Sequence, residues 1–72
     1  MSNRPFDLLN ESLGKEVLVI LKGDKQLRGT MKAFDVHMNL VLEEASQLVD
    51  GEMTTKYGKI IVRGDSVIMV SP

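Results

Sequence analysis

The stretch VLVILKGDKQLRGTMKA, residues 17–33, predicts two neighbouring β-strands. Its first five residues are all apolar and three of them are β-branched, as in a strand that is buried on both faces. The turn residues Lys22-Gly23-Asp24-Lys25 follow. Apolar and polar side chains then alternate, which indicates a second strand with one buried face and one solvent face. Gly29 interrupts that strand and predicts a bend or a bulge.

A short helix is predicted before these strands, over residues 5–13. Pro5 suits the first position of a helix, where its missing N–H is not needed. Gly14 follows as a residue that commonly ends a helix. A helix of this length is unstable alone, so one face must pack on the sheet. The residues that share this face are Phe6, Leu8, Leu9 and Leu13.

Three further strands are predicted downstream. Met38, Leu40 and Leu42 continue the alternation into a third strand, and residues 52–62 and 67–70 supply the fourth and fifth. The last strand is apolar on both faces, which indicates that a partner chain covers it. The sequence therefore predicts one all-β domain over residues 1–72. It has a short N-terminal helix at about 5–13 and a strongly bent five-stranded antiparallel sheet at about 16–71.

The dipeptide Asp50-Gly51 sets the register of the third and fourth strands. Asp-Gly is a strong signal for a two-residue hairpin turn, in which Val49 faces Glu52. Counting back from this turn places Asn39 opposite residue 62 and residue 37 near residue 64. Bulges would shift this pairing by a residue or two. The segments around residues 37 and 64 are therefore predicted to meet at one end of a long hairpin.

Composition limits the classes of protein to consider. The chain has 72 residues, a formal charge of −1, 43% hydrophobic residues and no cysteine. A domain this small buries only about 60% of its unfolded surface, which favours an oligomer over an isolated monomer. It carries no apolar run of 18 residues, and its first residues lack the apolar core of a secretory signal. We therefore expect a cytoplasmic protein with no membrane and no cofactor among its partners.

Two stretches carry the chemistry, Asp35-Val36-His37-Met38-Asn39 and Arg63-Gly64-Asp65. Their imidazole and guanidinium groups can stack on the two faces of a nucleobase. The carboxamide of Asn39 has a donor and an acceptor, so it can pair with the O4 and N3–H edge of uracil. Asp65 can hold Arg63 or Asn39 by hydrogen bonding. Together the two stretches predict a base-binding pocket, although each residue taken singly also suits an ordinary turn or surface ion pair.

Other chemistries have weaker signals in the sequence. A hydrolytic triad needs a nucleophile beside His37, and Ser66 lacks the turn context of an activated serine. A metal site built from His37, Asp35 and Asp65 lacks familiar ligand spacing. Neither an enzyme nor a metal site is therefore expected.

The chain resembles the Sm and Sm-like (Lsm) family, and most of all its archaeal members. The first Sm motif is similar to Val17–Leu42, with Gly29, Asp35 and Asn39 at the expected positions. The second motif is similar to Ile61–Asp65 and the apolar strand that follows it. The resemblance covers nearly the whole chain, from the predicted helix to the last strand.

This resemblance implies a fold, an assembly and a ligand. The Sm fold is a helix on a strongly bent five-stranded antiparallel sheet, an SH3-like barrel. Its subunits form a ring, usually of seven copies and alternatively of six, in which the last strand of one subunit pairs with the fourth strand of the next. Single-stranded uridine-rich RNA binds around the inner rim, at about one base per subunit, in RNA processing or RNA chaperoning.

The family's site residues transfer onto matching positions of this sequence. His37 and Arg63 would stack on the two faces of the base, and Asn39 would read its edge. Gly64 would offer a backbone contact, and Asp65 would support Asn39 or Arg63.

Further roles carried over from the family lie outside the pocket itself. Asp35 would organise the loop, and a second RNA site on the helix face would involve Arg4, Asn10 and Phe34. The alternative is a scaffold ring that binds protein partners and for which RNA is incidental. Base selectivity separates the two, because a scaffold has no reason to prefer uracil.

Overall fold

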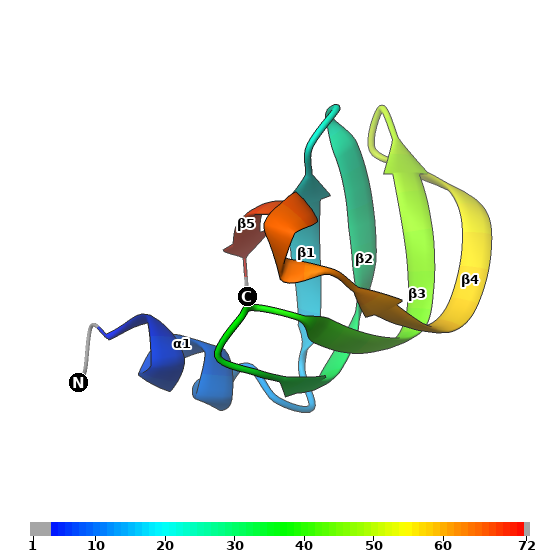
Figure 1. The fold of residues 1–72 in the computed structure, drawn as a ribbon. Coiled ribbons are helices and arrows are strands. Elements are labelled where there is room, and N and C mark those ends of the chain that lie inside the picture. Colours follow the sequence, from blue (N-terminus) through cyan, green and yellow to red (C-terminus); the bar gives the residue numbers. More distant parts are fainter. Residues whose placement is uncertain (1–3, 72) are drawn as a thin grey trace.

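The computed structural model describes residues 4–71, which form a short helix and a five-stranded antiparallel sheet (Figure 1). The strand order is β4-β3-β2-β1-β5. This confirms the predicted fold class; residues 1–3 and 72 of the predicted domain lie outside the described part. The elements are α1 (Pro5–Glu11), β1 (Glu16–Leu21), β2 (Lys25–Phe34), β3 (Leu40–Val49), β4 (Glu52–Val62), a 3-10 turn over Gly64–Ser66, and β5 (Val67–Ser71).

The hairpin between β3 and β4 turns at the predicted dipeptide. Asp50 and Gly51 both have positive φ, at 52° and 82°, as a type I′ turn requires. Val49 pairs with Glu52, as the sequence predicts. The turn residues therefore set the start of this long hairpin.

At the far end of the hairpin the pairing differs from the prediction by one residue. Leu40 pairs with Val62, whereas the count from the turn had placed Asn39 there. The register shifts where β3 and β4 bulge, and Glu44 and Gly58 near these shifts have positive φ of 52° and 76°. The bulges also increase the local bend, so that β3 and β4 curl away from a flat sheet (Figure 1).

Gly29 lies at a second place where strands approach closely. The register of β2 on β3 shifts beside it, which fits the predicted bulge. A Cβ atom at this glycine would lie 3.1 Å from the Cα of Ala45 on β3, closer than ordinary van der Waals contact. A side chain at this position would require the two strands to move slightly apart.

The core lies on one face of the curled sheet and consists of Val17, Val19, Leu27, Met31, Leu40, Leu42, Ala45 and Val62. On β1 the other face is only half-buried in the single protomer, so the predicted two-sided burial is incomplete. Ala33 continues the apolar alternation of β2, which predicts it on the buried face, but it is exposed because the register shifts again between Met31 and Ala33. Met38, expected in the third strand, lies in the preceding loop with a φ of 66°.

The helix is shorter and less buried than its sequence predicts. It ends at Glu11 rather than residue 13, and Gly14 takes a φ of 79° just beyond it. No residue of α1 is fully buried; Leu9 packs against the core, whereas Phe6 and Leu8 are exposed. The helix lies at the end of the sheet that also holds the loop between β2 and β3 (Figure 1).

The two edges of the sheet are the strands β4 and β5. Both edges carry exposed apolar side chains: Met53, Tyr57 and Ile61 on β4, and Ile68 and Met69 on β5. Edge strands of this kind offer free backbone groups and apolar surface for pairing with another chain. The exposed apolar side chains of β5 belong to the strand that the sequence predicts a partner chain to cover.

Candidate functional site

The loop between β2 and β3 is folded around the carboxylate of Asp35. Its Oδ1 accepts the backbone N–H of His37 at 2.9 Å and that of Asn39 at 3.1 Å. The backbone N–H of Asp35 donates to the carbonyl of Asn39 at 3.1 Å, which closes the loop. A short carboxylate that bonds to the backbone two residues ahead is a common way to fix a turn. Asp35 thus holds the predicted loop in one shape.

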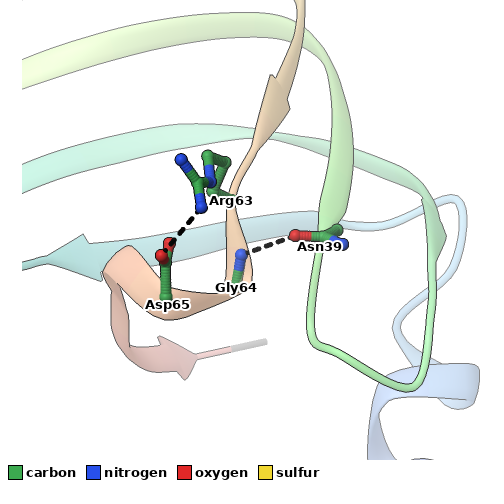
Figure 2. A network of polar contacts seen from close by, with 4 residues as sticks. All are labelled: Asn39, Arg63, Gly64 and Asp65. Carbon is green, nitrogen blue, oxygen red and sulfur yellow. Dashed lines mark hydrogen bonds and ion pairs between the residues drawn. The ribbon is translucent and has the colours of Figure 1, made fainter.

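Asn39 is fixed at both ends of its side-chain amide. Its Nδ2 donates to Oδ2 of Asp35 at 3.0 Å. Its Oδ1 accepts the backbone N–H of Gly64 at 2.8 Å (Figure 2). A carboxylate can only accept and a backbone N–H can only donate, so the oxygen and nitrogen of the amide cannot exchange places. The side chain therefore presents a donor and an acceptor in a fixed order.

Gly64 approaches the loop so closely that no side chain fits. A Cβ atom on Gly64 would clash with the backbone carbonyl oxygen of His37. This contact joins the two predicted stretches, although they are far apart in the sequence.

The replacement Gly64→Ala should destabilise the fold, because the clash is with backbone and cannot be relieved by a side-chain rotation. We expect a loss of about 1–3 kcal/mol, as for other overpacked positions. Gly23→Ala is the matched control. Its site is open but has a φ of 81°, so it should cost only about 1 kcal/mol of backbone strain. Thermal unfolding at one protein concentration compares them, and a smaller loss for Gly64→Ala would contradict the close approach.

Arg63 and Asp65 form an ion pair with 3.0 Å between Nη2 and Oδ2 (Figure 2). Their side chains are 80% and 65% exposed. Exposed pairs are screened by water and contribute little to stability. Arg63 is therefore held far more loosely than Asn39.

The two stretches enclose one open hollow of about 470 Å³. Its lining includes the five predicted pocket residues, and the sequence analysis missed only Met38. The lining residues are His37, Met38, Asn39, Arg63, Gly64 and Asp65. The hollow offers an imidazole and a guanidinium for stacking and an oriented amide for hydrogen bonding. These groups suit a flat, polar-edged ligand better than a bond-breaking reaction.

The support of Asn39 comes from a residue other than Asp65. Asp35 accepts a hydrogen bond from the amide of Asn39, whereas Asp65 accepts one from Arg63. The sequence had left the partner of Asp65 open between Arg63 and Asn39. The turn conformation of residues 35–39, which sequence spacing does not specify, decides this choice.

The bond from the amide of Asn39 is the main cause that lowers the pKa of Asp35 below its ordinary value of 3.8. Backbone N–H bonds and the nearby His37 lower this pKa further. The contribution of these bonds to stability is complete above pH 3.8 and is lost as the pH falls through the lowered pKa.

Acid titration should therefore leave the loop intact at pH 5 and open it only below pH 3.8. The backbone amide signals of His37 and Asn39 in ¹H–¹⁵N NMR spectra would report the change, because both amides donate to Asp35. We expect the two signals to move together with a midpoint below 3.8. A midpoint at or above 3.8 would contradict the bonded carboxylate.

The three residues predicted for a second site lie on or near α1. Arg4 precedes the helix and pairs with Asp7 at 2.9 Å, and Asn10 is exposed on the helix. Phe34, at the end of β2, packs edge-to-face on Phe6 with ring centroids 5.3 Å apart. Phe6, which the sequence predicts on the packing face of the helix, is 59% exposed and offers a flat surface in this region.

The groups needed for other chemistries are placed differently. Ser66 is half-buried in the 3-10 turn, and its backbone bonds to Arg63 and Lys22. Within residues 4–71, no group of three or more His, Cys, Asp or Glu side chains is arranged to hold a metal ion. The same residues contain no helix that is long and apolar enough to cross a membrane.

The sequence of this chain is similar to those of known proteins. Residues 7–72 match the LSM domain family model. An snRNP Sm-like protein of Methanococcoides burtonii is 53% identical over 72 residues, which cover all of both chains. Its counterpart in Pyrococcus horikoshii is 49% identical over 72 residues, covering all of this chain and 96% of the relative.

Solved structures agree with the sequence comparisons. The Sm protein of Pyrococcus abyssi, solved in complex with a uridine heptamer, superimposes with a TM-score of 0.93 at 47% identity. That alignment covers 97% of this chain and 99% of the other. A heptameric archaeal Sm protein superimposes with a TM-score of 0.86 at 42% identity, over 92% of this chain and 96% of the other.

Proposed function

Because this chain belongs to the LSM domain family, we propose that it assembles into a homo-oligomeric ring that binds single-stranded, uridine-rich RNA at its inner rim. It is an RNA-binding protein and not an enzyme. The observation that carries the proposal is the hollow between His37 and Arg63, into which the oriented amide of Asn39 is fixed. The heptameric relative and the relative bound to a uridine heptamer support a ring of seven copies with this ligand.

Asn39 has the hydrogen-bonding capacity that uracil requires. After donating to Asp35, its nitrogen retains one N–H, and after accepting from Gly64, its oxygen retains one lone pair. The uracil edge offers the acceptor O4 beside the donor N3–H, which complements this pair. Cytosine offers a donor and an acceptor in the opposite order. The fixed amide would then place donor against donor, so the pocket should favour uracil over cytosine.

Stacking supplies affinity without selectivity. His37 and Arg63 line the same hollow, and each can lie against one face of the base. Stacking contributes about 1–3 kcal/mol per base, so one pocket alone binds weakly. Several identical pockets on one strand raise the overall affinity because the later contacts form intramolecularly.

The two edges of the sheet support the assembly. β4 and β5 have different sequences, and each carries exposed apolar residues. Pairing β5 of one copy with β4 of the next makes a head-to-tail contact that uses both edges of every copy. Repetition of such a contact closes into a ring when its rotation divides a full turn. This arrangement covers the exposed residues Ile61 and Ile68.

Fluorescence anisotropy with short oligouridine, oligocytidine and oligoadenine tests the function directly. We expect oligouridine to bind at least tenfold more tightly than oligocytidine, because the wrong base at each pocket loses about 1–3 kcal/mol. Measurement at two salt concentrations should give a shallow salt dependence, since the chain has a net charge of −1. Equal binding of all three would instead favour a scaffold ring that binds protein partners.

The helix face and the cellular location complete the proposal. Phe6 and Phe34, with Arg4 and Asn10 nearby in α1 and its flank, would form a second stacking site for RNA. The exposed aromatic side chain of Phe6 supports this assignment.

An oligomeric ring that binds RNA for processing acts where the RNA is present, and we place it in the cytoplasm.

A further inference from the structure

The two sides of the base-binding hollow are unequally fixed. Asn39 is held by two hydrogen bonds and its loop by the carboxylate of Asp35. Arg63 forms an ion pair with Asp65, whose side chain is itself 65% exposed, and its own side chain is 80% exposed. A flexible guanidinium must be ordered before it can stack flat on a base, and this ordering reduces affinity. The single protomer thus lacks a firm support for Arg63.

An open apolar space lies beside Arg63, on the sheet face opposite the core, and it extends from β2 across β3 to the edge strand β4. This second hollow has a volume of about 520 Å³, and its lining includes Phe34, Val41, Ile61 and Arg63. It also touches Asn39, which lines the base-binding hollow as well. Ile61 is 74% exposed and belongs to β4, one of the two edges of the sheet. A strand that pairs with this end of β4 therefore lies next to Ile61 and closes the side of this space nearest the edge.

We propose that the next subunit of the ring closes the β4 side of this space with its β5 and thereby fixes Arg63 in its stacking position. The inference rests on the ring proposed above. The strand β5 suits the space because it reads Val-Ile-Met-Val-Ser, without a charge, and exposes Ile68 and Met69. Each base-binding site is then complete only when a neighbour is present. Assembly strengthens every pocket individually, in addition to linking several pockets on one strand.

Uridine monophosphate separates these two effects, because one mononucleotide occupies one pocket and gains nothing from repetition. Equilibrium dialysis of labelled uridine monophosphate measures its affinity for the ring and for variants. The first variant is Ile61→Ala, which removes the apolar wall at Arg63. The matched control is Met53→Ala, which truncates a 64% exposed apolar residue at the opposite end of the same strand. We expect Ile61→Ala rings to bind at least fivefold more weakly and Met53→Ala rings to bind as the parent does. Equal affinities of the two would overturn the proposal.

A dissociated protomer shows whether the effect passes through the neighbour. Ile68→Asp places a charge on the β5 edge and should release protomers, whose fold is checked by circular dichroism. We expect these protomers to bind uridine monophosphate at least tenfold more weakly than the ring. Adding Ile61→Ala to them should cause no further loss, since its neighbour is already absent. If the folded protomer binds as the ring does, or if Ile61→Ala weakens it equally, the inference is wrong. If it does not fold, the comparison of intact rings decides alone.

Failure of the inference is distinguishable from failure of the proposed function. A ring that binds uridine monophosphate and oligouridine, with protomers that bind the mononucleotide equally well, retains the function and loses only the inference. A ring that binds neither ligand contradicts the base-binding function itself.

Discussion

Replacing Asn39 with alanine should reduce the affinity for oligouridine by about 100-fold or more. Two hydrogen bonds orient the side-chain amide of Asn39 in the hollow: it donates one to Asp35 and accepts one from the backbone of Gly64. A two-bond contact with a base edge is worth about 1–3 kcal/mol. At about 1.4 kcal/mol per pocket, a strand that occupies two pockets already loses about 100-fold. Longer strands that engage more pockets should lose more.

Fluorescence anisotropy measures this loss, and mass measurement in solution shows that the variant ring is intact. Val36→Ala is the matched control, because Val36 lies in the same loop, is 82% exposed and has no part in the network around Asn39. Its affinity should equal that of the parent. Removal of the amide leaves the part-buried N–H of Gly64 without its acceptor, so unfolding should be about 1 kcal/mol easier. Unchanged oligouridine binding by Asn39→Ala would show that the base is read elsewhere.

Replacing Ile68 with aspartate should break the ring into smaller species. Ile68 is 62% exposed on the β5 edge of the single chain and would lie within the contact with β4 of the next copy. Burying an unpaired carboxylate in apolar surroundings costs several kcal/mol. The same penalty recurs at each junction of a closed ring, so the assembly loses far more than one contact.

Multi-angle light scattering during size-exclusion chromatography measures the mass. Val36→Asp provides the matched control, since it adds the same charge to a more exposed apolar residue in the loop between β2 and β3, outside both edge strands. That variant should keep the mass of the parent. A ring mass for Ile68→Asp would exclude β5 from the junction between copies.

Much of the fold could be predicted because short-range signals agreed with one another. Asp50-Gly51 specified its turn, and the continuous apolar runs together with the apolar alternation located all five strands. The prediction was wrong where one residue had to leave the regular repeat. Met38 follows the alternation of β3, but its positive φ places it in the loop. Such a departure depends on how the loop closes around Asp35, which no pattern of hydrophobicity records.

The candidate site could also be predicted only in part: its residues could be named from the sequence, but their contacts could not. The register count correctly brought the two stretches together, even though bulges shift the pairing by one residue. Such a shift changes which residues pair across the strands, but it leaves both stretches at the same end of the hairpin. The choice of Asp35 to support Asn39 was not predictable, since Asp65 has the same chemistry and lies as near in the expected register. The exposed face of α1 was also missed, because an amphipathic pattern does not say whether its partner belongs to the same chain.

The difference between the two sheet edges has a genetic consequence. A copy with a damaged β5 still carries an intact β4, so it can join a growing assembly at one end and then stop it. In a cell that makes both forms, such a copy terminates rings built mainly from normal protein. Mutations at Ile68 should therefore be dominant over the wild-type allele. Mutations at Asn39 leave both edges intact, so they should only dilute the RNA-binding capacity of mixed rings.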